Sequence, residues 1–328
     1  MNIKRYLGAF SATILVSLAQ SPAALAAGPY NITLAGGSVG GAWSAIGTAI
    51  GETLKKEYPG SAFTYEPGRE TSNLVLTSTG KVQLGIAHAQ MAFIAEKGLE
   101  PFKAPLNNIT AIALIDPEAA VQILTTQSSG ITDLAQIKDK KMPVRVSLNQ
   151  RGTLMSVTGE AVLAAYGISV KDIEAWGGRI TYGSYNQGLD LIKNGQADLI
   201  INMLAFPSGQ VQSAARDTKL NLIGLSKDAI TKLNAELRTD SIDIPANTYD
   251  FQSGQVNTIR GSVILVASSA MSNQEAGDIV RAMLTNFDFL QKAHATLGRL
   301  TPQILTQTAP IALHPGALMA YKAAGVIK

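Results

Sequence analysis

An internal repeat with an offset of 115 residues constrains the fold of this chain more than any other feature. An apolar strand followed by a glycine–hydroxyl turn and a helix occurs at Gly37-Ser38 and again at Gly152-Thr153. Further along each half, a glycine precedes a second apolar strand, at residues 82–86 and 197–201. The repeat predicts two similar lobes. Chance alignment of common α/β elements is the alternative, because glycine often ends helices.

Strands and helices alternate along the chain. Strands are expected at residues 31–34, 63–65, 82–87, 109–115 and 121–126, and apolar residues at helical spacing lie between the earlier ones. This order predicts an α/β architecture with largely parallel sheets. Ligands of open α/β sheets bind beyond the carboxyl ends of the strands, so two lobes that face each other would form a cleft.

The first 26 residues have the pattern of a secretory signal peptide. Lys4 and Arg5 precede an apolar stretch at residues 6–18, and the small residues at 24–26 form a cleavage site before Ala27. The stretch is shorter than the roughly 20 apolar residues of a membrane-spanning helix. We therefore expect a periplasmic protein of residues 27–328, released by cleavage and not anchored as a lipoprotein.

Composition excludes several classes of function. The chain has no cysteine, which excludes disulfides, thiol catalysis and a lipid-attachment cysteine. The formal net charge of +3 falls by two once Lys4 and Arg5 are removed, too little for nucleic acid or an anionic membrane surface. Three histidines, at 88, 294 and 314, show no metal-ligand spacing. We predict no metal, no cofactor, no nucleic-acid partner and no direct membrane insertion.

The two glycine–hydroxyl turns are candidate anion sites. Free N–H groups and the helix dipole at a helix start favour a carboxylate. Arg151 lies beside the second turn, where a guanidinium could bind a carboxylate through two hydrogen bonds. The alternatives are that Ser38 and Thr153 only cap their helices, and that Arg151 is a solvated surface residue.

Four segments carry a family resemblance. They are a glycine-rich turn and helix at 36–47, an asparagine-to-strand segment at 72–87, a strand, turn and helix at 144–166, and a His-Pro-Gly-Ala turn at 314–317. With them, nearly the whole chain after residue 26 resembles the substrate-binding subunit of tripartite ATP-independent periplasmic (TRAP) transporters of the TAXI family.

The resemblance implies a type II periplasmic-binding-protein fold, with two α/β lobes joined by a two-strand hinge and a cleft between them. Domain I would combine residues 27–117 and 260–328, and domain II would be residues 118–259. It also implies a non-enzymatic, monomeric protein. This protein would capture a small organic anion, such as glutamate or a dicarboxylate, for a TRAP permease driven by an ion gradient.

The chain departs from the family pattern where ligand would bind. Arg69 and Glu70 replace a glycine and a serine, and Arg151 replaces another serine. We predict that the two arginines clamp a dianion from opposite lobes. Alternatively, Glu70 forms a salt bridge with one of them, and the ligand carries one negative charge or none.

Polar and aromatic residues near the predicted cleft complete the candidate set. Two of them have an alternative interpretation, which is a hydrogen bond to backbone for His88 and packing in the core for Trp43. Asn186 is expected in the same wall as Tyr185. The predicted ligand-binding residues are Gly37, Ser38, Val39, Trp43, Arg69, Asn73, His88, Gln90, Arg151, Gly152, Thr153, Tyr185 and Phe206.

Two other functions fit parts of the sequence. A binding protein of the same fold could serve an ATP-driven importer or a sensor. A serine hydrolase is the remote alternative, because residues 36–40 match G-x-S-x-G with Ser38 as nucleophile. The hydrolase turn normally follows several strands, whereas this one follows the first.

Overall fold

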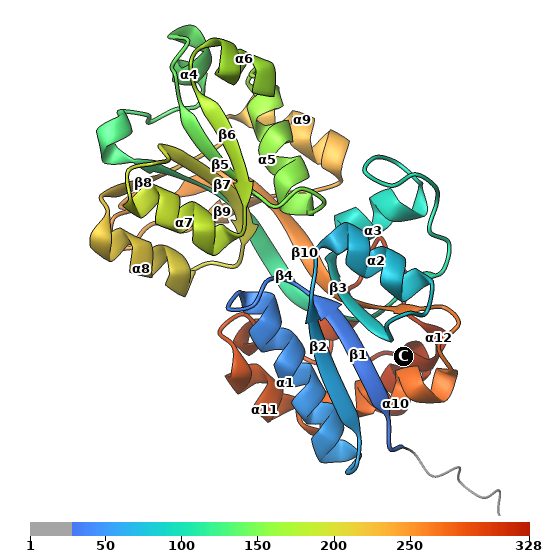
Figure 1. The fold of residues 1–328 in the computed structure, drawn as a ribbon. Coiled ribbons are helices and arrows are strands. Elements are labelled where there is room, and N and C mark those ends of the chain that lie inside the picture. The colour runs from blue at the N-terminus through green and yellow to red at the C-terminus, as the bar shows by residue number, and fades with distance from the viewer. Residues whose placement is uncertain (1–27) are drawn as a thin grey trace, which may run out of the picture.

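The computed structural model describes residues 28–328, so the predicted signal peptide lies outside the described residues. The described chain forms two α/β lobes joined by two long strands (Figure 1). The connecting strands are β4 (Ile109–Thr126) and β10 (Val256–Ser268).

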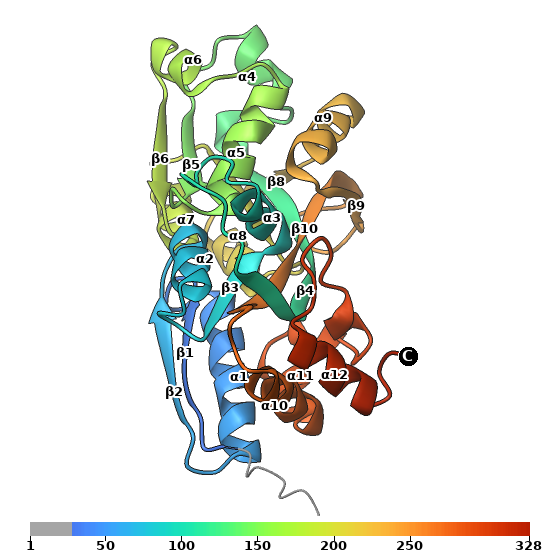
Figure 2. The same ribbon diagram turned by 90° about the vertical axis from the view of Figure 1, so that its right-hand side faces the viewer.

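The first lobe is built from both ends of the described chain. Its elements are β1 (Asn31–Gly36), α1 (Ala42–Glu57), β2 (Ala62–Pro67), α2 (Glu70–Ser78), β3 (Leu84–His88), α3 (Ala89–Glu96), α10 (Asn273–Thr285), α11 (Phe287–Ala293), the short 3-10 helices η2 (Leu297–Arg299) and η3 (Ile304–Thr306), and α12 (Pro315–Ala323). Helix α1 packs beside α10 and α11, and α12 packs beside α10 (Figure 2).

The second lobe is continuous in sequence. Its elements are η1 (Gln127–Ser129), α4 (Ala135–Asp139), β5 (Arg145–Asn149), α5 (Leu154–Ala165), α6 (Val170–Ala175), β6 (Arg179–Gly183), α7 (Tyr185–Lys193), β7 (Leu199–Leu204), α8 (Gly209–Asp217), β8 (Leu220–Ile223), α9 (Lys227–Leu237) and β9 (Asp240–Ile244).

The sheet topology repeats between the lobes. The strand order is β2-β1-β3-β10-β4-β7-β5-β6, with β8 on β4 and β9 on β10. In the first lobe β1 pairs in parallel with β2 and β3, and β3 pairs with antiparallel β10. In the second lobe β5 pairs in parallel with β6 and β7, and β7 pairs with antiparallel β4. The predicted fold class is therefore confirmed, and β5 and β7 follow β1 and β3 at the offset of the sequence repeat.

The connection between the lobes differs from the sequence expectation. Residues 109–126 form one continuous strand, whereas the sequence predicts two strands separated by residues 116–120, which include Pro117. This segment lies where the β4–β10 pairing is irregular, with register shifts between Gly261 and Val266. Proline lacks the N–H that a regular ladder needs, so it fits such a bulge. The predicted domain boundaries, 117/118 and 259/260, fall within these strands and remain a proposal.

Helix α1 illustrates how the sequence forms the core. Ile46, Ile50 and Leu54 recur at the spacing of one helix face, and all three are buried. On the face toward β2, a Cβ at Gly51 would lie 2.2 Å from the ring of Phe63, so glycine lets helix and strand approach closely. No helix within residues 28–328 is both long and apolar enough to cross a membrane.

Candidate functional site

A cavity of about 120 Å³ lies between the lobes, and residues of both lobes line it. The carboxyl ends of all four central parallel strands reach it, through Gly37 after β1, His88 in β3, Asn149 in β5 and Leu204 in β7. At roughly 10–15 Å³ for each water-sized occupant, it holds on the order of ten non-hydrogen atoms. The cleft predicted from two facing α/β lobes is thus present as an interlobe cavity.

Helices α1, α2, α5 and α7 begin at this cavity, and in α2, α5 and α7 the first turn is occupied by other groups of the chain. In α2 the Thr71 N–H donates to the Gly152 carbonyl, 3.1 Å away. In α5 the Thr153 hydroxyl accepts from the Ser156 N–H. In α7 the Ser184 hydroxyl caps the helix.

Helix α1 differs from the other three. Its N-cap, Gly41, has no side-chain hydrogen bond to the helix, and its first turn contains no acidic residue. Gly41, Ala42 and Trp43 line the cavity. No described residue accepts a hydrogen bond from the Ala42 or Trp43 N–H. The first turn of this 16-residue helix therefore brings two unpartnered backbone donors and the positive end of the helix dipole to residues that line the cavity.

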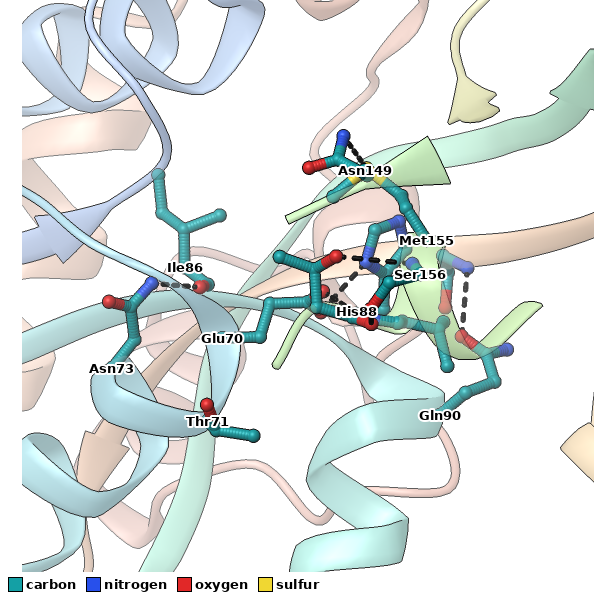
Figure 3. A network of polar contacts seen from close by, with 12 residues as sticks. Glu70, Thr71, Asn73, Ile86, His88, Gln90, Asn149, Met155 and Ser156 are labelled. Carbon is teal, nitrogen blue, oxygen red and sulfur yellow. Dashed lines mark hydrogen bonds and ion pairs between the residues drawn. The ribbon is translucent and has the colours of Figure 1, made fainter. Parts of the chain in front are cut away.

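Glu70 and His88 form a buried pair beside this helix start (Figure 3). One Glu70 oxygen, Oε1, accepts from the His88 N–H at 2.9 Å and lies 2.8 Å from the His88 Nδ1. The other oxygen, Oε2, accepts from the Leu154 N–H at the start of α5 in the opposite lobe. The carboxylate favours a proton on Nδ1, so Nε2 of neutral His88 is an acceptor.

The other His88 nitrogen is available to a ligand. His88 is 1% exposed and lines the cavity, yet its Nε2 has no hydrogen-bond partner among the described residues. The ring lies 5.2 Å from that of Trp43, between centroids. Nε2 can accept a hydrogen bond from a ligand when the ring is neutral and donate one when it is protonated.

Asp116 brings a second carboxyl group to the cavity, from the irregular part of β4. It is 5% exposed, and its Oδ1 accepts from the Glu118 N–H at 3.0 Å. Burial raises the pKa of Asp116 to about 6, and the hydrogen bond from the Glu118 N–H offsets part of the rise. Asp116 is therefore an acceptor held in the cavity wall at a cost in stability.

The second lobe contributes mainly neutral polar groups. The Asn149 amide donates to the Asn202 carbonyl oxygen at 3.0 Å, and both side chains line the cavity. The buried Tyr185 hydroxyl has no partner within residues 28–328, and burial raises its pKa well above the ordinary value. This wall favours hydrogen bonding over charge pairing.

Seven of the thirteen predicted residues line the cavity, and six do not. Those that line it are Gly37, Ser38, Trp43, Arg69, His88, Thr153 and Tyr185, and Asn186 joins them. Those outside the lining are Val39, Asn73, Gln90, Arg151, Gly152 and Phe206.

The residues outside the lining have other contacts. Val39 is 73% exposed. The Asn73 amide donates to two backbone carbonyls, and the Gln90 side chain bonds backbone groups near β10 and α9. Phe206 is buried, with its ring 5.2 Å from the Arg299 guanidinium.

Both predictions about the arginines are corrected by the geometry. The Arg151 side chain is 66% exposed, lies 3.7 Å over the Tyr182 ring and is 3.6 Å from Glu160. It therefore faces away from the cavity, and no two-arginine clamp is formed. Glu70 pairs with His88 and α5, so it forms no salt bridge with either arginine.

Sequence reasoning missed several cavity residues. The sequence pattern indicates Glu70 only as a partner for arginine and assigns no role to Asp116. A signal for Asp116 was present, because an acid beside a proline interrupts a long apolar run at a strand. The pairing of Asn149 with Asn202 depends on strands 53 residues apart, which no local pattern indicates.

The hydrolase alternative finds no support in this geometry. Ser38 lines the cavity, but no histidine within residues 28–328 hydrogen-bonds its hydroxyl, and His88 Nδ1 is bonded to Glu70. A nucleophilic serine needs a base within hydrogen-bond reach. Likewise, no group of three or more acidic or histidine side chains in the described part of the chain is arranged to hold a metal ion.

A model of the NMT1-like family matches residues 34–325, almost the whole described chain. The chain belongs to the NMT1-like family. The TAXI family of TRAP transporters, which the motifs suggested, is corrected by this match. Strands, turns and helix starts of this kind recur in both lobes, so the four motifs in order indicate the fold and not the family.

Solved structures similar to this NMT1-like chain share its fold. MatC from Rhodopseudomonas palustris, with bound malate, is 14% identical over 91% of this chain and 99% of its own, with a TM-score of 0.59. The periplasmic binding protein BugD is 13% identical over 90% and 94%, with a TM-score of 0.57. The binding protein of an ABC phosphonate transporter from Pseudomonas aeruginosa is 11% identical over 81% and 78%, with a TM-score of 0.53. At identities this low, the structural similarity establishes the type II periplasmic-binding-protein fold and no shared function.

Proposed function

We propose that this chain is a periplasmic solute-binding protein that captures a small organic anion in the interlobe cavity and delivers it to an ATP-driven importer. The observation that carries the proposal is the start of α1, whose two unpartnered backbone donors belong to residues that line the cavity. A carboxylate there would accept both hydrogen bonds and interact favourably with the helix dipole. Arg69, also in the lining, adds positive charge at the rim.

The rest of the cavity favours a ligand that also carries a hydrogen-bond donor. Asp116 and the Nε2 of neutral His88 are acceptors, and both line the cavity. A hydroxyl or amino group on the ligand would satisfy them. The volume limits such a ligand to on the order of ten non-hydrogen atoms. The proposed solute class is therefore small hydroxy- or amino-carboxylates.

Delivery to an importer is supported by the fold and by similar proteins. Two lobes that close around a solute by a hinge, with β4 and β10 as the connection, present a different surface to a membrane partner when occupied. Domain I would be residues 27–117 and 260–328, and domain II residues 118–259. The structural similarity to the binding protein of an ABC phosphonate transporter favours an ATP-driven partner. We propose a monomer, exported by the signal peptide at residues 1–26.

A thermal-shift screen of residues 27–328 tests this function. The panel would contain hydroxy acids, amino acids, dicarboxylates, phosphonates and neutral sugars. A solute that binds only the folded state at 100 times its Kd stabilises by about 2.7 kcal/mol. We expect small carboxylates to raise the melting temperature. A panel in which only neutral sugars do so would contradict the proposal.

A proline at the first position of α1 tests the contribution of this helix start independently of the other cavity residues. Ala42→Pro removes one of the two backbone donors, while proline at the first helical position is well tolerated. The extended conformation of Gly41, with φ −86° and ψ 166°, suits a residue before proline. Val170→Pro at the first position of α6 is the matched control. We expect Ala42→Pro to abolish the carboxylate-induced shift and Val170→Pro to preserve it.

A further inference from the structure

The sequence repeat pairs the start of α1 with the start of α5. Gly37-Ser38 before α1 corresponds to Gly152-Thr153 before α5, and Ser38 and Thr153 both line the cavity. By this symmetry the cavity has two helix starts, one in each lobe, that could each bind an anionic group. No carboxylate of the described residues accepts a hydrogen bond from the first turn of α1, whereas one does so at the start of α5.

The carboxylate at α5 belongs to the protein. Glu70 Oε2, from the first lobe, accepts the hydrogen bond of the Leu154 N–H, the first of α5. Glu70 is 0% exposed, and its other oxygen accepts from His88. A carboxylate at a helix start is favoured by the dipole, and each of its bonds is charge-assisted. Glu70 therefore occupies the place that a second carboxylate of a ligand would take.

The neighbouring contacts hold Glu70 in this place. The Thr71 N–H and hydroxyl both donate to the Gly152 carbonyl, at 3.1 and 3.2 Å. Gly152 has a φ of +84°, and a Cβ there would lie 2.6 Å from the Thr71 hydroxyl. The glycine thus lets α2 of one lobe meet the α5 turn of the other closely enough for Glu70 to reach the Leu154 N–H.

We propose that Glu70 is a specificity-determining residue that restricts the cavity to ligands with a single anionic group. The proposal rests on the function proposed above and deepens it, because it selects monoanions over dicarboxylates. A ligand carboxylate directed at α5 would find its donor already bonded and a buried negative charge beside it. The unpartnered His88 Nε2 on the other side of the same ring then contacts the uncharged part of the ligand.

Isothermal titration calorimetry with two matched probes tests the proposal. Malate and 2-hydroxybutyrate share a four-carbon skeleton and a hydroxyl, and differ by a carboxylate in place of a methyl group. We expect the wild-type protein, residues 27–328, to bind 2-hydroxybutyrate at least about tenfold more tightly than malate, because like charges close together are disfavoured by more than that factor. We expect Glu70→Ser, which frees the α5 donor, to shift the ratio toward malate by at least about tenfold.

Two further variants keep the test decisive. Glu70→Gln removes the charge at nearly constant size, and it is expected to shift the ratio in the same direction if Glu70→Ser does not fold. Glu236→Gln removes the charge of an exposed acid on α9, outside the cavity lining, so the ratio should stay that of the wild type.

The contrary outcomes are distinguishable. Equal wild-type affinity for the two probes, or an unchanged ratio in both folded Glu70 variants, overturns the role of Glu70 and leaves the proposed function intact. A wild-type protein that binds neither probe, and no carboxylate of the thermal-shift panel, overturns the proposed function and the role of Glu70 with it.

Discussion

Asp116→Asn is predicted to stabilise the protein while weakening its binding of solute. Burial raises the pKa of Asp116 from 3.8 to about 6. The folded state therefore prefers the protonated acid, and ionisation above the folded pKa costs about 3 kcal/mol, at 1.36 kcal/mol for each pKa unit. Asparagine keeps the carbonyl oxygen that accepts from the Glu118 N–H and carries no charge.

The sign of the pH dependence follows from proton linkage. Between pH 4 and pH 6 the folded state binds more protons at Asp116 than the unfolded state does, so stability falls as pH rises through this range. The variant should gain little at pH 4 and about 3 kcal/mol at pH 8. For a chain of this size that corresponds to an increase in melting temperature of roughly 5–10 °C at pH 8.

Thermal unfolding followed by circular dichroism at pH 4 and pH 8 measures this effect. Asp250→Asn, at an exposed acid, is the control and should unfold like the wild type at both pH values. At pH 8 the Asp116 variant should also bind the best carboxylate of the screen about 10–100-fold more weakly, since it loses a hydrogen bond to a charged group. A variant that is less stable than wild type at pH 8, or whose advantage does not depend on pH, would refute the reasoning.

Three further substitutions test the roles of an exposed arginine, of the glycine contact between the lobes and of an ion pair in the second lobe. Arg151→Ala should change solute affinity less than about threefold by calorimetry, because an exposed arginine outside the cavity contributes little. A tenfold loss of affinity would show that Arg151 does contact the solute. Gly152→Val should weaken solute binding about tenfold or more in the same assay, because its Cβ would strain a positive φ and displace Thr71; unchanged affinity would show that this cross-lobe contact is dispensable. Asp198→Asn should destabilise the protein by about 1–3 kcal/mol at pH 7, where the Arg145 hydrogen bonds hold the aspartate pKa low against burial. That difference should shrink as pH falls through the ordinary range of an aspartate, and urea unfolding at pH 7 and pH 3 would show a constant difference if the ion pair is unimportant.

The fold could be predicted from the sequence because the patterns that indicate it are local and occur in both halves of the chain. Strand and helix periodicity gave the α/β alternation, and the offset of 115 residues placed β1 and β3 opposite β5 and β7. The hinge was less accessible. The sequence predicts a gap at residues 116–120 between two strands, and only pairing with β10 makes residues 109–126 one strand.

The residues of the site could be predicted from the sequence only in part, for a physical reason. Glycine turns at helix starts indicate where backbone donors could meet a ligand, and Ser38 and Thr153 of these turns both line the cavity. They do not tell which donors the chain itself occupies. Glu70 reaches Leu154 across the cleft, 84 residues away in sequence, so the difference between an available and an occupied helix start depends on how the lobes meet.

A crystal structure of residues 27–328 with the carboxylate that gives the largest thermal shift tests the central claim most directly. We predict that one carboxylate of the ligand lies about 2.7–3.2 Å from the Ala42 and Trp43 N–H groups, with its hydroxyl or amino group toward Asp116. Glu70 should remain bonded to the Leu154 N–H. A carboxylate bound instead at the start of α5 with Glu70 displaced, or on the surface at Arg151, would contradict the account.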